Sequence, residues 1–259
     1  MECFVIKSHG RSSLLFTTAL YLAFIFIPLL SATEYSFKTN IKGQYTFANY
    51  RWVFDQPEFL HYIFRSVWLS ALSVLVTLAF LIPLQTWLHI TQSNWRRLVE
   101  TVSLLPLIIP VVTLAIGAQV AMPMWVQDSV FELPFFYSML SLPYTYRAID
   151  IGLNSSPIKT FYEASRVNGG SWTKTIQWIV LPNIKNSVLA ASALGFALCI
   201  GEFTLTSLLH WDTFPTWIND VSQDTVLGAI TLSVISLVIP IILISIFAMA
   251  ITKKEKTHD

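Results

Sequence analysis

Long stretches of apolar residues, separated by short polar segments, dominate the pattern of this chain. A helix rises about 1.5 Å per residue, so about 20 apolar residues are enough to cross the hydrocarbon core of a bilayer. Several stretches meet or approach this length. They are residues 14–30, 67–90, 101–122, 130–148, 188–209 and 226–251. The pattern therefore predicts six membrane spans.

The type of span follows from backbone hydrogen bonding. Hydrocarbon contains no water to pair with free N–H and C=O groups, so only helices or a closed β-barrel can cross it. The alternation of apolar and polar residues that barrel strands need is absent. We therefore expect an all-α fold, a polytopic membrane bundle of six transmembrane helices, in a single domain over residues 1–259.

The composition agrees with a membrane protein. Apolar residues make up 54% of the chain and charged residues 12%, against about 25% charged residues in soluble domains. The net charge of +1 and the scattered basic residues predict no nucleic-acid partner. Lys7 and Arg11 precede the first stretch as they would in a signal peptide, but residues 30–32 fit a cleavage site poorly. We expect an uncleaved first helix.

The basic residues indicate the orientation of the spans, because cytoplasmic loops are enriched in Lys and Arg. With both termini in the cytoplasm, most basic residues fall on the cytoplasmic side. They are Lys7, Arg11, Arg96, Arg97, Arg147, Lys159, Arg166, Lys174, Lys185, Lys253, Lys254 and Lys256. The opposite side would hold Lys38, Lys42, Arg51 and Arg65. This distribution predicts a multi-pass protein with cytoplasmic termini.

The polar loop of residues 152–186, between the fourth and fifth stretches, carries a helical pattern of its own. Residues 156–168 place apolar side chains at helical spacing. Gly169 and Gly170 then predict a sharp turn, because glycine adopts at little cost the positive φ that ends a helix. Ser171 is a suitable N-cap for a second helix. We expect a helix, a glycine turn and a second helix on the cytoplasmic face.

This loop also contains a set of residues at characteristic spacing. They are Glu163, Ala164, Ser165, Gly169, Ile179, Leu181 and Pro182. The spacing resembles the signature loop of importer permeases of the ATP-binding-cassette class, which reads Glu-Ala-Ala, three residues, Gly, nine residues, Ile, one residue, Leu-Pro. Ser165 departs from that pattern by a change between small residues. Residues 104–110 and 201–203 also resemble related permeases, so the similarity extends from the second span to the sixth.

The resemblance implies a permease of the bacterial cytoplasmic (inner) membrane whose loop is a coupling helix. In such permeases this loop docks on a separate ATPase subunit, which binds ATP-Mg. Glu163 would contact that subunit, Gly169 would supply the turn, and Arg166 would be a possible salt-bridge donor. The resemblance also implies a second permease (a copy or a paralogue) and an extracytoplasmic substrate-binding protein, besides membrane lipid.

The chain itself shows no catalytic site. Residues 170–175 are similar to a phosphate loop, but the Gly before Lys174 is missing and no strand precedes them. The histidines show no metal-ligand spacing with acidic residues or cysteines. We therefore expect a non-catalytic subunit that binds no cofactor or metal.

Glu202 lies in the predicted fifth span. An ionisable group inside a membrane costs on the order of 2.5–3.5 kcal/mol on insertion scales, so it usually faces a cavity or a partner. Two interpretations are open. Glu202 lines the translocation pathway and meets a cationic or polar substrate, or it forms a structural hydrogen bond to a neighbouring helix or to the facing subunit.

The resemblance is closest to permeases for polyamines, iron(III), thiamine or phosphonates, on residues 201–203 and 214–217. It implies that the chain forms the pathway for a small solute delivered by a binding protein. Two alternatives are a secondary transporter driven by an ion gradient and a non-transporting membrane scaffold or sensor. Inverted repeats or paired broken helices would favour the secondary transporter, and the sequence shows neither.

Overall fold

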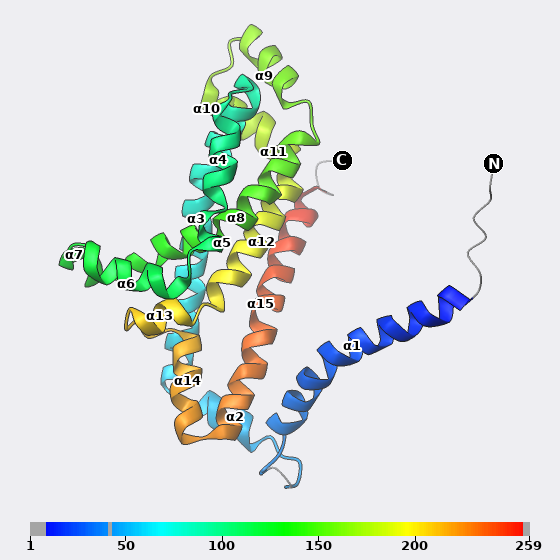
Figure 1. Ribbon diagram of the computed structural model, residues 1–259, viewed down its shortest axis with the longest axis vertical. Coiled ribbons are helices and arrows are strands. Elements are labelled where there is room, and N and C mark those ends of the chain that lie inside the picture. Colours follow the sequence, from blue (N-terminus) through cyan, green and yellow to red (C-terminus); the bar gives the residue numbers. More distant parts are fainter. Residues whose placement is uncertain (1–8, 41–42, 256–259) are drawn as a thin grey trace. The chain divides into compact units, whose positions relative to one another are not determined.

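The computed structural model describes residues 9–40 and 43–255 (Figure 1). These residues are almost entirely helical, and apart from one isolated bridge between Lys38 and Tyr45 they form no β-structure. The all-α prediction is therefore confirmed for the described part of the chain. Three of the lysines used to predict the orientation of the spans lie outside it, namely Lys7, Lys42 and Lys256.

Long apolar helices follow the predicted stretches. Within the described residues, α1 (His9–Ser36), α3 (Glu58–Thr91) and α15 (Val226–Glu255) are long and apolar enough to cross a membrane. Two bent helix pairs raise the number to five if each pair is one span. The predicted fourth span corresponds to α8 (Glu132–Asn154), which has 23 residues but is more polar and is not among these five.

Shorter helices connect or continue the long ones. They are α2 (Ala48–Asp55), α4 (Trp95–Ser103), α5 (Leu105–Ile108), α6 (Val111–Ala121), α7 (Met124–Gln127), α9 (Ile158–Val167), α10 (Trp172–Thr175), the π-helix η1 (Ile176–Val180), α11 (Leu181–Asn183), α12 (Lys185–Ile200), α13 (Thr204–Leu208) and α14 (Phe214–Asp224). The chain forms two compact units. Unit 1 comprises Met1–Phe59 and Ile218–Leu237, and unit 2 comprises Leu60–Trp217 and Val238–Asp259. The expectation of one domain over residues 1–259 stays a prediction.

In unit 1, the buried Ser36 at the end of α1 is hydrogen-bonded to residues of α2 and α15. The Ser36 hydroxyl lies 2.8 Å from the Tyr50 hydroxyl, and the Ser36 carbonyl accepts a hydrogen bond of 2.9 Å from the Asn49 amide. Thr231 of α15 donates to the same carbonyl at 3.4 Å. These bonds satisfy a backbone group at the end of α1, where the helix offers no partner of its own.

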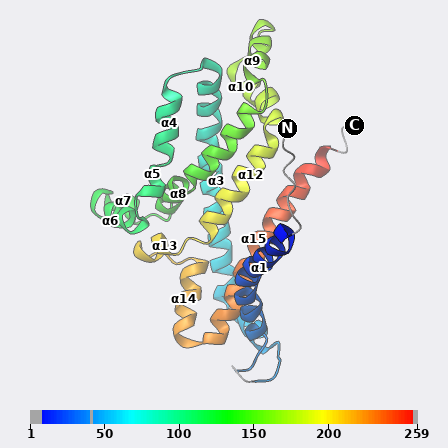
Figure 2. The ribbon, with the colours of Figure 1, turned by 45° about the vertical axis from the view of Figure 1, so that its right-hand side comes forward.

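Unit 2 is built around α8 and α12, which form the most extensive helix pair among the described residues. One apolar cluster, which includes Ile149 and Ile184, joins α3, α8 and α12 to the segment that follows α8. A second cluster, which includes Leu133 and Leu205, joins α3, α6, α8 and α13. Figures 1 and 2 show α8 and α12 side by side, with α9 and α10 at one end of the unit.

The predicted third span is not one helix. The direction of the chain changes by 97° between Trp95–Ile108 and Val111–Ala121. Ile109 is extended, with φ −82° and ψ 119°, as expected before Pro110, because the proline ring excludes the helical region for the preceding residue. The span predicted over residues 101–122 is therefore bent at Pro110 and is not one straight helix.

The predicted fifth span, residues 188–209, is also interrupted. The helix α12 ends at Ile200, and α13 begins at Thr204 after a break of three residues. Gly201 at this break has φ −92° and ψ 1°, outside the helical region. The break therefore places Glu202 between two helices and not within one.

The close approach of α8 and α12 yields a test. A Cβ atom on Gly152 would lie 2.5 Å from the Cβ of Ser187, whereas a Cβ on Gly117 would meet nothing within 4 Å. Gly152→Ala should therefore destabilise the protein by about 1–3 kcal/mol through overpacking. Gly117→Ala is the matched control and should not destabilise it, because alanine favours a helix over glycine. Loss of monodisperse protein on heating in detergent measures both, and equal behaviour of the two variants would contradict this packing.

Candidate functional site

The loop predicted over residues 152–186 is shorter than expected, because α8 extends to Asn154 and α12 begins at Lys185. The helices α9, α10, η1 and α11 (residues 158–183) lie between them and are called the coupling segment below. Gly152 does not end α8, because its missing side chain lets the helix continue against Ser187. The predicted order of helix, glycine turn and second helix is present.

The glycine turn is a Schellman motif. Gly169 has φ +76°, which an L-residue with a side chain rarely adopts. The Gly169 N–H donates to the carbonyl of Arg166 at 3.1 Å, and the Gly170 N–H donates to the carbonyl of Ser165 at 2.8 Å. These two bonds satisfy carbonyls at the end of α9, as this motif requires. The turn predicted at Gly169 is therefore built as the sequence indicated.

Ser165 has a structural role that the family pattern does not suggest. Its hydroxyl lies 2.9 Å from the hydroxyl of the buried Thr175, so the two halves of the coupling segment are hydrogen-bonded to each other. Gly170 is needed beside it, because a Cβ there would overlap the Ser165 hydroxyl. Ser171 accepts a bond of 3.4 Å from the Lys174 N–H, which confirms the predicted N-cap. The departure from alanine thus fits its surroundings.

Apolar side chains attach the coupling segment to the core of unit 2. Ile158, Val180 and Ile184 are buried in the cluster that also contains residues of α8 and α12. Leu181 packs against the same cluster, while Pro182 is exposed. The π-helix η1 ends just before Pro182, which has no N–H to continue regular helical bonding. Movement of this segment would therefore be passed directly to α8 and α12.

The outer surface of the coupling segment exposes both charged and apolar side chains. Glu163 is exposed, and Val167 and Trp178 are 88% and 77% exposed. A shallow cavity of about 360 Å³ lies beside them. Its lining residues are Phe161, Ala164, Ser165, Asn168, Trp178, Ile179 and Asn183. Arg166 is exposed, and its guanidinium donates to the Gly170 carbonyl at 3.0 Å, so within this chain it stabilises the glycine turn.

Glu202 has a local hydrogen-bond partner. Its carboxylate accepts a bond of 2.8 Å from the Leu205 N–H, at the first turn of α13, where free N–H groups and the helix dipole favour a negative charge. This contact corresponds to neither a neighbouring helix nor a facing subunit. Glu202 also borders a hollow with Tyr137 and Cys199, so a place at the pathway is compatible with its capping role.

Two hollows lie along α8 and α12. The small hollow, of about 330 Å³, contains Glu202 and is bordered by the bend at Pro110. The large hollow, of about 710 Å³, is mostly apolar and contains Glu100 and Arg147. Leu107 and Tyr144 line both. The two hollows therefore share part of their lining and are together called the groove below; α4, α5, α8 and α12 provide most of its walls.

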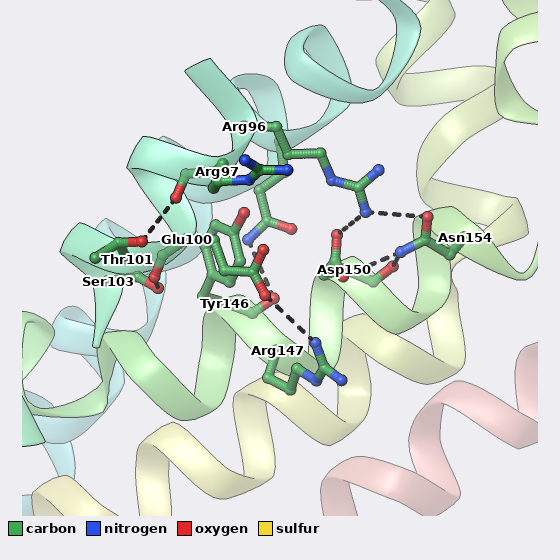
Figure 3. Close-up of polar contacts among 10 residues, drawn as sticks. Arg96, Arg97, Glu100, Thr101, Ser103, Tyr146, Arg147, Asp150 and Asn154 are labelled. Carbon is green, nitrogen blue, oxygen red and sulfur yellow. Dashed lines mark hydrogen bonds and ion pairs between the residues drawn. The ribbon is translucent and has the colours of Figure 1, made fainter. Parts of the chain in front are cut away.

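Two ion pairs connect α4 to α8 beside the large hollow (Figure 3). Arg96 donates to Asp150 at 2.8 Å and to Asn154 at 3.1 Å. Arg147 lies 3.7 Å from Glu100. In the sequence these arginines indicate only the orientation, and their acidic partners were not predicted. Asp150 and Asn154 are spaced four residues apart, as are Arg96 and Glu100, and this spacing could have indicated two polar helix faces.

The capping contact of Glu202 can be tested by substitution. Glu202→Ala removes the acceptor of the Leu205 N–H and should destabilise the protein by about 1 kcal/mol, the usual net contribution of one hydrogen bond. Glu202→Gln keeps an acceptor oxygen and should retain most of that stability. Thermal denaturation in detergent distinguishes them. If the Gln variant loses as much as the Ala variant, the charge and not the cap is what Glu202 supplies.

Comparison with known proteins gives relatives among transport proteins. A probable ABC transporter permease protein of Sinorhizobium fredii is 27% identical over 66% of the chain and 31% of that protein. A probable molybdenum ABC transporter permease protein of Haloferax volcanii is 26% identical over 61% of the chain and 63% of that protein. A molybdenum transport system permease protein of Azotobacter vinelandii is 24% identical over 54% and 68%. The chain spans less than two thirds of the first two relatives.

Solved structures share the fold. A bacterial ABC transporter involved in the import of the acidic polysaccharide alginate matches with a TM-score of 0.66 and 19% identity over 94% of both chains. A bacterial alginate ABC transporter in complex with an alginate pentasaccharide-bound periplasmic protein matches with a TM-score of 0.60 and 18% identity over 91% of both. These similarities support the all-α membrane fold.

The family assignment rests on most of the chain. Residues 90–254, which include the groove and the coupling segment, match the family model described as a binding-protein-dependent transport system inner membrane component. The members of this family are permease components, which confirms the prediction of a non-catalytic subunit. The chain therefore belongs to the family of inner membrane components of binding-protein-dependent transport systems.

Proposed function

We propose that this chain is the permease subunit of an ATP-driven importer and that its coupling segment docks on a separate ATPase subunit. The observation that carries the proposal is the exposed end of this segment. Val167 and Trp178 would be covered by the ATPase subunit, and Glu163 would accept a hydrogen bond or an ion pair from it. ATP-Mg would be bound by that subunit, and this chain would bind no cofactor of its own.

The packing of unit 2 supports a mechanical link from the ATPase subunit to the groove. The coupling segment is continuous with α8 at one end and with α12 at the other, and its apolar residues share a cluster with both. These two helices are also walls of the groove. A shift of the coupling segment would therefore move both walls together, since packed interfaces transmit displacement and do not absorb it.

The groove would be one half of the translocation pathway. It is open along the side of unit 2, so a second permease, either a copy or a paralogue, would supply the opposite wall. Glu202 would face this pathway from the break between α12 and α13, with its capping bond to Leu205 holding the carboxylate in place. Glu202 would thus fix the start of α13 at the wall of the pathway, in addition to any contact with the solute.

The orientation follows from the distribution of basic residues. The helix α4, which carries Arg96 in its first turn, lies toward the end of unit 2 that carries α9 and α10 (Figure 2), as expected if both face the cytoplasm. Both chain termini would then be cytoplasmic, in a bacterial inner membrane. The substrate-binding protein would deliver its solute at the opposite, extracytoplasmic end.

The resemblance and the relatives suggest different chemical classes of substrate. The sequence resemblance suggests polyamines, iron(III), thiamine or phosphonates, whereas two relatives are named molybdenum permeases. The full importer, reconstituted in liposomes with its binding protein, would identify the solute by the stimulation of ATP hydrolysis. Spermidine, iron(III), thiamine, a phosphonate and molybdate would be added in turn, and stimulation by only one of them would assign it.

Two other functions remain as alternatives. Broken helices are a feature of ion-driven secondary transporters, and this chain contains two bent helix pairs. A scaffold or sensor would also need an exposed cytoplasmic segment. Neither alternative predicts an ATPase subunit bound to the coupling segment, so that interaction discriminates among the three.

Substitutions at the coupling segment should remove the ATPase subunit. Val167→Asp places a charge where an apolar side chain would be buried, which should reduce recovery of the ATPase subunit about tenfold or more. Gly169→Pro is incompatible with φ +76° and should disrupt the turn. Affinity purification in mild detergent, followed by identification of the co-purified proteins, measures the recovery.

The stability of each variant decides what a loss means. Val167 is exposed, so Val167→Asp should keep the thermal stability of the wild-type chain, whereas Gly169→Pro should lower it. If the folded wild-type chain recovers no ATPase subunit with ATP, with ADP or without nucleotide, the importer proposal is wrong and the two alternatives gain support.

A further inference from the structure

The two ion pairs between α4 and α8 differ in how completely they are formed. Arg96 and Asp150 are 2.8 Å apart, the Asp150 side chain is only 14% exposed, and Asn154 completes the cluster. Arg147 and Glu100 are 3.7 Å apart and are 67% and 47% exposed. The first pair is a closed contact within the chain. The second is long for a hydrogen bond and leaves both charged groups accessible.

The accessible pair lies on the large hollow of the groove. Glu100 and Arg147 line it together with apolar side chains that are themselves substantially exposed. Leu107, Ile151 and Leu194 are 55%, 57% and 47% exposed. Lipid chains could cover these apolar groups but would offer no fixed partner to the two charged groups. A protein surface with charges of its own suits the whole patch better.

We propose that a second copy of this chain covers the large hollow and that Arg147 of each copy pairs with Glu100 of the other. This proposal rests on the proposed function, which needs a second permease. A two-fold interface is self-complementary, so a residue that contacts its counterpart in one direction is contacted in the other. One acidic and one basic group on the same rim meet that condition. The pair would close the groove between the copies and separate when the groove opens.

Reversal of single charges tests the pairing between copies. One tagged chain carries Glu100→Arg and a differently tagged chain carries Arg147→Glu. Two opposite-charge contacts form between these chains, whereas each chain meets like charges in a copy of itself. After co-expression and affinity purification, each variant should recover the other about tenfold better than it recovers its own kind, as two restored ion pairs would produce.

The matched control moves the same charge away from the groove. Arg97 is on α4, is exposed, and does not line the large hollow. A chain with Arg97→Glu keeps Glu100 and Arg147, so it forms one opposite-charge and one like-charge contact with the chain that carries Glu100→Arg. It should recover that chain less well than it recovers its own kind. Equal preference in this control, no preference in the test pair, or failure of wild-type copies to recover each other would overturn the proposal.

A second test uses cysteine variants, which add no charge and show directly whether residues 100 and 147 of two chains lie close together. Chains with Glu100→Cys and chains with Arg147→Cys, co-expressed and oxidised, should form a disulfide-linked dimer of about twice the 29.3 kDa of the chain. Two folded chains that never cross-link would also overturn the proposal. The ATPase subunit in the same purification reports separately on the proposed function, because it binds the coupling segment and not the groove.

Discussion

The close packing of α8 against α12 is the contact on which the other features of unit 2 depend. Gly152 and Gly195 remove side chains where the two helices meet, so that Ser187 and Thr145 of the facing helices approach closely. Helices in membranes gain little from the hydrophobic effect between one another, and close backbone contact is their main alternative. The same two helices carry the coupling segment at one end and form walls of the groove along their length. The contact between α8 and α12 therefore links the coupling segment to the groove.

The breaks in the third and fifth predicted spans give the groove its shape. The chain turns by 97° around Pro110, and α12 stops at Ile200, so both segments contribute walls to the small hollow. Breaks of this kind free backbone groups, which must find partners when water is absent. The carboxylate of Glu202 supplies one such partner to the Leu205 N–H. An acidic residue in an apolar stretch is thus explained first by the local backbone.

Polar contacts between α4 and α8 lie close to the point where α8 leads into the coupling segment. Arg96, Asp150 and Asn154 connect α4 to α8 (Figure 3), two turns or fewer before α8 leads into the coupling segment. A rigid contact at this place would make α4, α8 and the segment move as one body. The Arg147–Glu100 pair lies next to it and is longer and more exposed, as the proposed contact between copies requires.

The sequence by itself determined the membrane class, the positions of the long helices and the glycine turn at Gly169. These depend on the length of apolar stretches and on the conformational freedom of one residue, both of which are local. It also contained the reason for the bend at Pro110, although the apolar stretch as a whole suggested one helix. Only the tertiary structure decided that the Ser165 hydroxyl faces that of Thr175 and that Arg96 and Arg147 meet Asp150 and Glu100. Those contacts join residues through folded geometry, and apolar periodicity does not encode which polar side chains will face each other.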